Sequence, residues 1–151
     1  FLPLPVNVRH IIQYIVSQHM TNYPAIQFIY YGKPDLIVSA DPRLITNITT
    51  QLLTNAIQYS TNQQTIIVTL TMKDDLIHLT IQDHGIGIPP EDLPYIFEPF
   101  HRGENIGSIG GTGLGLTIVH DCVKLHEGTI EVDSKLNTGT TFDVKLKTQR
   151  Y

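Results

Sequence analysis

Apolar residues recur every three or four positions in three stretches of this chain, and this spacing predicts three helices. The first helix is expected to begin after Asn7, a residue type that favours the N-cap position. The second is expected to begin after Asp41, which precedes a proline, and to run to about Tyr59. The third begins near Gly115, and a short helix is expected near 92–97.

Alternation of apolar and polar residues predicts strands between these helices. Six runs of this kind occur, at 26–31, 36–39, 65–72, 76–83, 129–134 and 141–147. Only a short turn separates the members of each successive pair, so we expect three strand pairs. The order of helices and strands predicts an α+β fold. We expect a two-layer α/β sandwich in which a mixed, mostly antiparallel sheet is covered on one face by helices.

The composition indicates one domain without an obvious charged binding surface. The chain has 151 residues, a formal net charge of −4 and no long run of like charge, so we expect no nucleic-acid partner and no membrane contact by this domain. The single cysteine, Cys122, lies on the apolar face of the third predicted helix and excludes an internal disulfide. We expect residues 1–151 to form one cytoplasmic domain, and the initial Phe1 indicates a fragment of a longer protein whose membrane attachment is left open.

Glycine is concentrated in one part of the chain. Eight of the eleven glycines lie from Gly85 to Gly115, and six of these fall in two clusters at 83–87 and 110–115. Glycine clusters let backbone N–H groups approach anionic oxygens, and a helix that begins directly after one adds its positive end. The two clusters together indicate a nucleotide site.

Asp83 continues an apolar series in the strand before the first glycine cluster. Ile77, Leu79 and Ile81 face one way, and Asp83 is next in that alternation. A carboxylate on the covered face needs a partner. It is expected to accept a hydrogen bond from a ligand donor such as the exocyclic amine of adenine, although a cap for the following turn is the open alternative.

The second predicted helix carries a stripe of neutral amides. No charged residue occurs between Arg43 and Lys73, which favours a polar groove over a solvated face, with an ordinary amide-rich surface as the alternative. An amide oxygen is a suitable ligand for Mg²⁺. The amides recur at steps of four, four and three, at Asn47, Gln51, Asn55 and Gln58.

Five short motifs, taken in order, resemble those of the catalytic ATP-binding domain of sensor histidine kinases, within the gyrase, Hsp90, histidine kinase and MutL superfamily. They are an N box at 51–60, a first glycine box at 83–89, an F box at 96–103, a second glycine box at 111–116 and a terminal box at 139–142. Each motif is weak alone, but five in register are specific. The resemblance covers nearly everything from Phe1 to Leu146 and implies a Bergerat-type fold that binds ATP and Mg²⁺.

The resemblance also implies residue roles. Asn55 would coordinate Mg²⁺, Asp83 would accept the adenine amine, and Thr140 would support adenine through water. The other expected contacts to the nucleotide are Tyr59, Gly85, Gly87, Ile88, Arg102, Gly111, Thr112, Gly113, Leu114 and Gly115.

Residues 88–112 would form a lid over the nucleotide. Arg102 is the candidate for the γ-phosphate, because a guanidinium suits phosphate oxygens; a solvated loop arginine is the alternative. Phe97 and Phe100 would latch the lid, or else pack in the core.

Two candidate catalytic positions depart from the family pattern. Gln51 stands where histidine kinases usually have Asn and where related ATPases have a Glu that activates water. Gln58 stands where many histidine kinases have Lys. We therefore expect a domain that presents the γ-phosphoryl group rather than one that hydrolyses ATP. An ATP-sensing pseudokinase and an anti-sigma-type serine kinase remain the alternatives.

The resemblance implies two partners in two-component signal transduction. None of the seven histidines lies in a convincing phosphoacceptor motif. The acceptor is expected on a dimerisation domain that precedes Phe1 in the same parent protein, and a response regulator receiver domain would be the second partner. Without its acceptor domain, this protein histidine kinase fragment is expected to be inactive in autophosphorylation.

Overall fold

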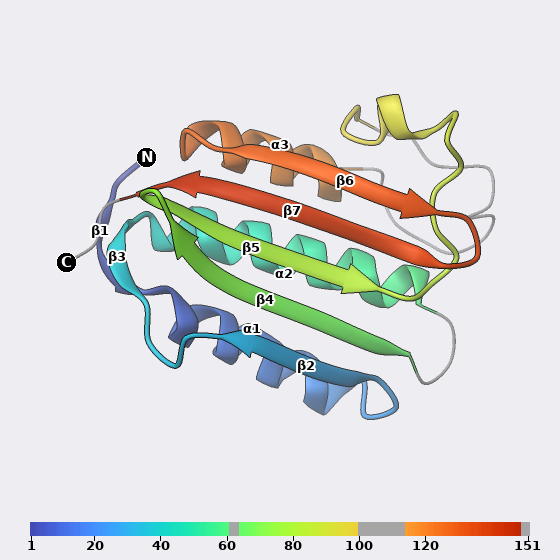
Figure 1. Cartoon of the computed structure of the whole chain (residues 1–151), viewed down its shortest axis with the longest axis horizontal. Coiled ribbons are helices and arrows are strands. Elements are labelled where there is room, and N and C mark those ends of the chain that lie inside the picture. Colours follow the sequence, from blue (N-terminus) through green and yellow to red (C-terminus); the bar gives the residue numbers. More distant parts are fainter. Residues whose placement is uncertain (61–63, 100–113, 149–151) are drawn as a thin grey trace.

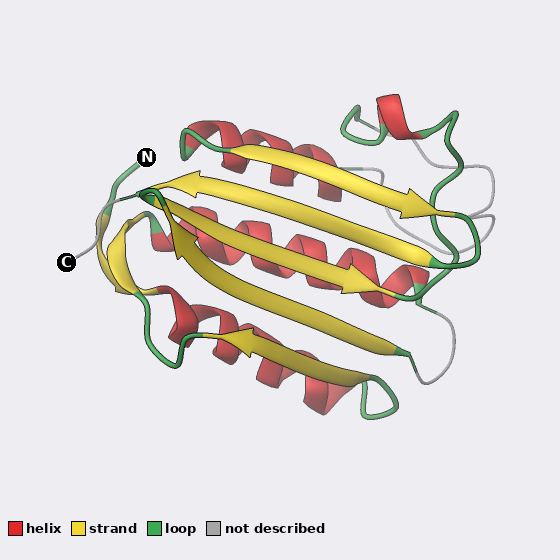
Figure 2. Ribbon diagram, viewed as in Figure 1, coloured by secondary structure: helices red, strands yellow, loops and turns green. Residues whose placement is uncertain are grey.

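Two layers, one of helices and one of strands, make up the fold. The computed structural model describes residues 1–60, 64–99 and 114–148. Within these ranges the α-helices are α1 (Val8–Asn22), α2 (Pro42–Tyr59) and α3 (Gly115–Leu125). The strands are β1 (Leu4–Asn7), β2 (Gln27–Gly32), β3 (Ile37–Ala40), β4 (Thr65–Lys73), β5 (Leu76–Asp83), β6 (Thr129–Lys135) and β7 (Gly139–Lys147). All three α-helices lie against the same face of the larger sheet (Figures 1 and 2).

The larger sheet has the strand order β2-β4-β5-β7-β6. β2 is parallel to β4, and the other neighbours in this sheet are antiparallel. This arrangement confirms the expected α+β sandwich with a mixed, mostly antiparallel sheet. Both predicted hairpins, β4–β5 and β6–β7, are also confirmed.

The third expected strand pair is wrong. The runs at 26–31 and 36–39 do not pair with each other, because β2 extends the larger sheet beside β4 while β3 pairs with β1. Phe28 and Tyr30 of β2 pack against the core, so this strand gains more by joining the large sheet. β1 was not predicted, since its sequence contains Pro5, a residue tolerated only where its missing N–H is not needed for pairing.

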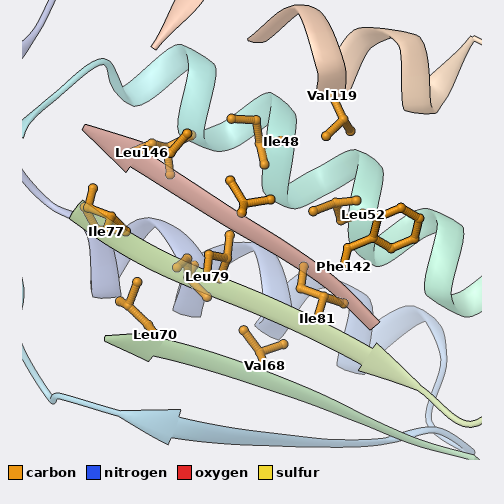
Figure 3. Close-up of a cluster of buried hydrophobic side chains, with 14 of the residues drawn as sticks. Ile48, Leu52, Val68, Leu70, Ile77, Leu79, Ile81, Val119, Phe142 and Leu146 are labelled. Carbon is orange, nitrogen blue, oxygen red and sulfur yellow. The ribbon is translucent and has the colours of Figure 1, made fainter. Parts of the chain in front are cut away.

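The core lies between the helices and the sheet (Figure 3). Side chains from β4, β5 and β7 face those of α2 and α3 across the two layers. Cys122 is buried among them, as expected for a core residue. The labelled residues in the figure are Ile48, Leu52, Val68, Leu70, Ile77, Leu79, Ile81, Val119, Phe142 and Leu146.

Asp41 caps α2, as predicted. Its Oδ1 accepts a hydrogen bond from the backbone N–H of Arg43 at 3.0 Å, and its Oδ2 accepts one from that of Leu2 at 2.8 Å. The Asp41 residue is fully buried. Burial raises the pKa of this carboxyl, but the hydrogen bonds from Leu2 and Arg43 and the charge of Arg43 outweigh burial and bring the pKa to about 2.

The N-terminal segment contacts two helices at one end of the helical layer, near Asp41. The backbone N–H of Asp41 donates to Nε2 of the buried His126, which follows α3, at 3.1 Å. The ring of Phe1 packs edge-on against that of His126, with centroids 4.8 Å apart. Phe1 and Leu2 therefore contact the start of α2 and the end of α3 together.

The first helix begins where the sequence predicts, but its cap differs. Asn7 occupies the N-cap position of α1, yet its side chain makes no capping bond. Instead, its amide donates to Asp35 at 2.9 Å and accepts from the backbone N–H of Leu36 at 3.2 Å. The loop before β3 thus competes successfully for this side chain.

The expected short helix near 92–97 is a 3₁₀ turn over Leu93–Tyr95. Phe97, which follows it, packs partly buried against the core, and its ring centroid lies 6.5 Å from that of Phe142. The core-packing alternative is therefore confirmed for Phe97.

Candidate functional site

Several of the predicted site residues that the structure describes lie at one end of the sandwich. The end of β5, the start of β7 and the end of α2 meet there, at the opposite end of the molecule from the two chain termini (Figure 1). The start of α3 is placed beside α2. Four segments that are distant in the sequence therefore contribute to one region.

Asp83 lies on the covered face of the sheet, as its place in the alternation predicts. Its residue is only 2% exposed, and Oδ1 accepts a hydrogen bond from the backbone N–H of Gly85 at 2.9 Å. Burial raises the pKa of this carboxyl, and backbone N–H groups of Gly85 and Thr140 partly offset the rise. The capping role is thus confirmed. A carboxylate has about four acceptor positions, more than this hydrogen bond uses, and the role of Asp83 toward a ligand amine stays a prediction.

The turn after β5 packs tightly against the end of α2. A Cβ atom on Gly85 would lie 1.9 Å from the carbonyl O of Tyr59, so only glycine fits there. The next residue, Ile86, donates its backbone N–H to the same carbonyl at 3.1 Å. The first glycine cluster and Tyr59 are therefore in direct contact.

Gly87 requires glycine for a second reason. Its φ is +75°, and a Cβ atom there would lie 2.2 Å from the carbonyl O of Lys135 at the end of β6. The backbone N–H of Asn137, in the β6–β7 turn, donates to the carbonyl O of Ile86 at 2.8 Å. The first glycine cluster is thus held between α2 on one side and the β6–β7 hairpin on the other.

Thr140 is the cross-strand partner of Asp83 and is 4% exposed. Its Oγ1 lies 2.8 Å from Oγ of Ser134, which also accepts the backbone N–H of Ile88 at 2.8 Å. Ser134 was not among the predicted site residues. Its signal is in the sequence, because Ser134 continues the covered-face series of Ile130 and Val132, just as Asp83 continues the series of β5.

The amides of α2 are not equally exposed. Gln51, Asn55 and Gln58 are partly buried, whereas Asn47 is exposed. The amide stripe is therefore more buried toward the C-terminal end of α2. This burial favours the polar-groove interpretation for Gln51, Asn55 and Gln58 over a solvated surface.

Gln51 also lies beside the start of α3. A Cβ atom on Gly115, the first residue of α3, would be 2.9 Å from Oε1 of Gln51. Leu114 occupies the N-cap position, and no acidic residue lies in the first turn of this helix, which the structure describes in full. The positive end of α3 is thus placed against the amide stripe without a competing carboxylate.

Several predicted residues lie outside the described ranges. They are Phe100, Arg102, Gly111, Thr112 and Gly113. The described part of the expected lid comprises 88–99.

The side chains of this region suit ATP together with a Mg²⁺ ion that takes one of its ligands from the protein. Within residues 1–60, 64–99 and 114–148, no group of three or more His, Cys, Asp or Glu side chains could hold a metal ion. Mg²⁺ commonly takes one or two protein oxygens and completes its shell with phosphates and water, which fits the partly buried amide of Asn55. The buried carboxylate of Asp83 and the close backbone at Gly85 fit a flat base with an amino group.

Known proteins are similar to this chain in sequence and in fold. Residues 40–150 match the family described as histidine kinase-, DNA gyrase B-, and HSP90-like ATPase. Sensor-like histidine kinase SenX3 of Mycobacterium tuberculosis is 35% identical over 145 residues, which are 93% of this chain and 35% of SenX3. Sensor histidine kinase RppB of Synechocystis is 41% identical over 106 residues, which are 69% of this chain and 22% of RppB. The chain thus spans about a third or less of these relatives.

Solved structures agree. Mycobacterial sensor histidine kinase MprB superimposes with a TM-score of 0.86 at 27% identity and covers 99% of both chains. The catalytic domain of histidine kinase ThkA gives a TM-score of 0.84 over 100% of both chains, and its 22% identity supports the fold alone.

The chain belongs to the family of histidine kinase-, DNA gyrase B- and HSP90-like ATPases. Within that family, the expected resemblance to the catalytic ATP-binding domain of a sensor histidine kinase is confirmed. Among the described residues, no helix is both long enough and apolar enough to span a membrane.

Proposed function

We propose that this domain binds Mg²⁺-ATP and presents the γ-phosphoryl group for transfer to a histidine on a separate dimerisation domain. The observation that supports this most directly is the buried carboxylate of Asp83, next to a backbone turn that only Gly85 permits. A buried acceptor beside a close backbone suits a flat base that carries an amino group. A solvated turn would need neither feature.

Each group then has a distinct task. Asp83 and Thr140 hold the base, Asn55 offers its amide oxygen to Mg²⁺, and the positive end of α3 at Gly115 lies toward the phosphates. Bound Mg²⁺ neutralises phosphate charge, and catalysis would consist of positioning and charge stabilisation. Tyr59, Gly87, Ile88 and Leu114 complete the expected contacts among the described residues.

The residue at position 51 favours presentation of ATP over its hydrolysis. Gln51 has an amide, which cannot take a proton from water as a carboxylate can. Gln51 lies against Gly115 at the positive end of α3, where the proposal places the phosphates. This position therefore has no general base to activate water. Slow hydrolysis would preserve ATP for transfer to a partner.

We also propose the assembly in which this transfer occurs. Residues 1–151 would act as one cytoplasmic domain with a lid at about 88–112, and Arg102 in that lid would contact the γ-phosphate. The phosphoacceptor domain of the same parent protein would receive the phosphoryl group, and a response regulator receiver domain would take it next.

Replacement of Asp83 tests the base contact. Asp83→Asn should weaken ADP binding by roughly 10- to 100-fold, because a hydrogen bond to a charged group is worth about 1.5–3 kcal/mol. Isothermal titration calorimetry measures the affinity. The matched control is Asp143→Asn, on the outer face of the same sheet. Unchanged affinity in a folded Asp83→Asn protein would refute the assignment.

Replacement of Asn55 tests the metal contact. Asn55→Ala should remove most of the Mg²⁺ dependence of ATP binding while adenosine binding is nearly unchanged. Asn47→Ala, two turns earlier on the same stripe but exposed, is the control. A wild-type Mg²⁺ response in Asn55→Ala would show that another residue holds the metal.

The ATP-sensing pseudokinase is the second candidate, and Gln58 favours it because a family lysine near the phosphates is absent. Labelling with γ-³²P-ATP in the presence of the parent's phosphoacceptor domain distinguishes the kinase from the pseudokinase. The kinase should label a histidine on that domain, while this chain alone labels none of its own. Bound ATP without any labelling would favour the pseudokinase.

A further inference from the structure

Ser134 on β6 contacts three groups beside the proposed nucleotide site. Its Oγ accepts the backbone N–H of Ile88 at 2.8 Å, and it lies 3.2 Å from the carbonyl O of Gly139 and 2.8 Å from Oγ1 of Thr140. Ser134 is opposite Thr140, and Thr140 is opposite Asp83. These three side chains therefore form a row across β6, β7 and β5, which lie side by side in Figure 1.

Counting hydrogens assigns the direction of each bond. A serine hydroxyl has one proton to donate and two lone pairs that accept. The N–H of Ile88 takes one lone pair of Ser134, and the carbonyl of Gly139 can only accept the Ser134 proton. The third contact then requires Thr140 to donate its proton to Ser134. This is the arrangement in which all three contacts are hydrogen bonds.

The consequence concerns the other side of Thr140. With its proton directed to Ser134, the Thr140 hydroxyl has only lone pairs left for a ligand or for a bridging water. Its neighbour Asp83 is a carboxylate, which has only acceptor positions, and it already accepts the backbone N–H of Gly85 at 2.9 Å. The edge formed by Asp83 and Thr140 thus presents acceptors, and it favours a donor on the base.

We infer that Ser134 is a positioning residue that fixes the proton of the Thr140 hydroxyl and thereby sets the preference of the site for a 6-aminopurine over a 6-oxopurine. This inference rests on the proposed nucleotide-binding function. In direct contact with both side chains, without the bridging water that the family resemblance implies at Thr140, an amino group donates to both acceptors. A carbonyl oxygen at the same position faces two acceptors without a proton between them. When the Ser134 hydroxyl is absent, Thr140 can rotate and donate, so a 6-oxopurine is rejected less strongly.

Nucleotide selectivity tests the inference. The 151-residue chain is titrated calorimetrically with ADP and with IDP in the presence of Mg²⁺, and the ratio of the two affinities is compared between variants. Ser134→Ala should lower the preference for ADP by about fivefold or more, the value of one neutral hydrogen bond. Ser134→Thr, which retains the hydroxyl, should keep most of the preference. Ser17→Ala, which removes a hydroxyl that donates to the carbonyl O of Gln13 within α1, should not change it.

A double-mutant cycle shows whether Ser134 acts through Thr140. In a Thr140→Val background, Ser134→Ala should change the ADP to IDP ratio by less than twofold, because no hydroxyl remains to be oriented. A general loss of packing would instead weaken both nucleotides equally and leave the ratio unchanged in either background.

Three results overturn the inference. The first is an unchanged ratio of ADP to IDP affinity in folded Ser134→Ala, and the second is a Ser134→Thr protein that behaves like Ser134→Ala. The third is a change of this ratio by Ser134→Ala that is equally large in the Thr140→Val background. Circular dichroism verifies the fold, and if Ser134→Ala does not fold, Ser134→Cys replaces it, since a thiol is a weak donor and acceptor. If wild type binds neither ADP nor ATP, the proposed function fails, and with it the nucleotide preference. Wild-type binding with unaltered selectivity in the variants refutes only the role of Ser134.

Discussion

Asp41 supports the helix that carries the amide stripe, and its removal is expected to lower the stability of the whole domain. The carboxylate is fully buried and accepts the N–H groups of Leu2 and Arg43. Asp41→Ala removes the cap of α2 and also leaves the N–H of Leu2 without its acceptor. Both losses act on the same end of the helix.

The expected magnitude follows from the pKa. A shift from 3.8 to about 2 corresponds to about 2.5 kcal/mol of stabilisation by the charged carboxylate. Loss of an N-cap alone costs about 1 kcal/mol, and this overlaps with the first figure because the Arg43 bond contributes to both. We therefore expect Asp41→Ala to lower the free energy of unfolding by about 2–3 kcal/mol at pH 7.

The pH dependence gives a second, independent measurement. Because the folded pKa of about 2 is lower than the unfolded pKa of 3.8, the stabilisation is complete above about pH 5 and is lost progressively as the pH falls toward 2. Urea unfolding followed by circular dichroism should show that the difference between wild type and Asp41→Ala shrinks by about 1 kcal/mol from pH 7 to pH 3. The exposed Asp121→Ala is the control, with an expected change below about 0.5 kcal/mol. A difference under 0.5 kcal/mol at pH 7, or one that is equal at pH 7 and pH 3, would refute this account of Asp41.

Three further predictions concern other buried positions. Gly85→Ala would place a Cβ atom 1.9 Å from the carbonyl O of Tyr59, so urea unfolding should show a loss of at least about 2 kcal/mol, and weaker ADP binding should accompany it. Burial lowers the pKa of His126, so the free energy of unfolding of the wild type should decrease as the pH falls below 6.5. In His126→Gln the free energy of unfolding should depend less on pH between pH 6.5 and pH 5. Burial raises the pKa of the Cys122 thiol, so a disulfide reagent at pH 7.4 should react at least about 100-fold more slowly with the native protein than with the urea-unfolded chain; equal rates would contradict its burial.

Much of the fold can be predicted because its signals are local. Each hairpin has its two strands next to each other in the sequence, and the cap at Asp41 is followed at once by a proline and an amphipathic helix. The alternation that buries Ile81 also buries Asp83, so the inward position of one proposed site residue follows from the strand pattern alone. The roles of Asn55 and Thr140, in contrast, came from the family resemblance and stay predictions.

The features that sequence reasoning missed depend on distant partners. β2 is beside β4 because Phe28 and Tyr30 add to a core whose other members lie far along the chain, and no local rule distinguishes this from pairing with β3. The role of Ser134 depends on the register of β6 against β7. Its inward position could be read from the alternation, but its three hydrogen-bond partners could not.

The row of Ser134, Thr140 and Asp83 has a consequence for the folding kinetics. β5 and β7 are neighbours in the sheet, yet a long connection that includes α3 and β6 separates them in the chain, so their pairing closes a large loop. Contacts of high sequence separation form slowly, and the proposed base-binding edge therefore exists only once the last strand has docked. A chain that is still being synthesised, or one truncated before β7, lacks this edge and cannot recognise a purine through it. Nucleotide that is present during refolding should then leave the folding rate nearly unchanged and slow unfolding instead, since it binds only the completed sheet.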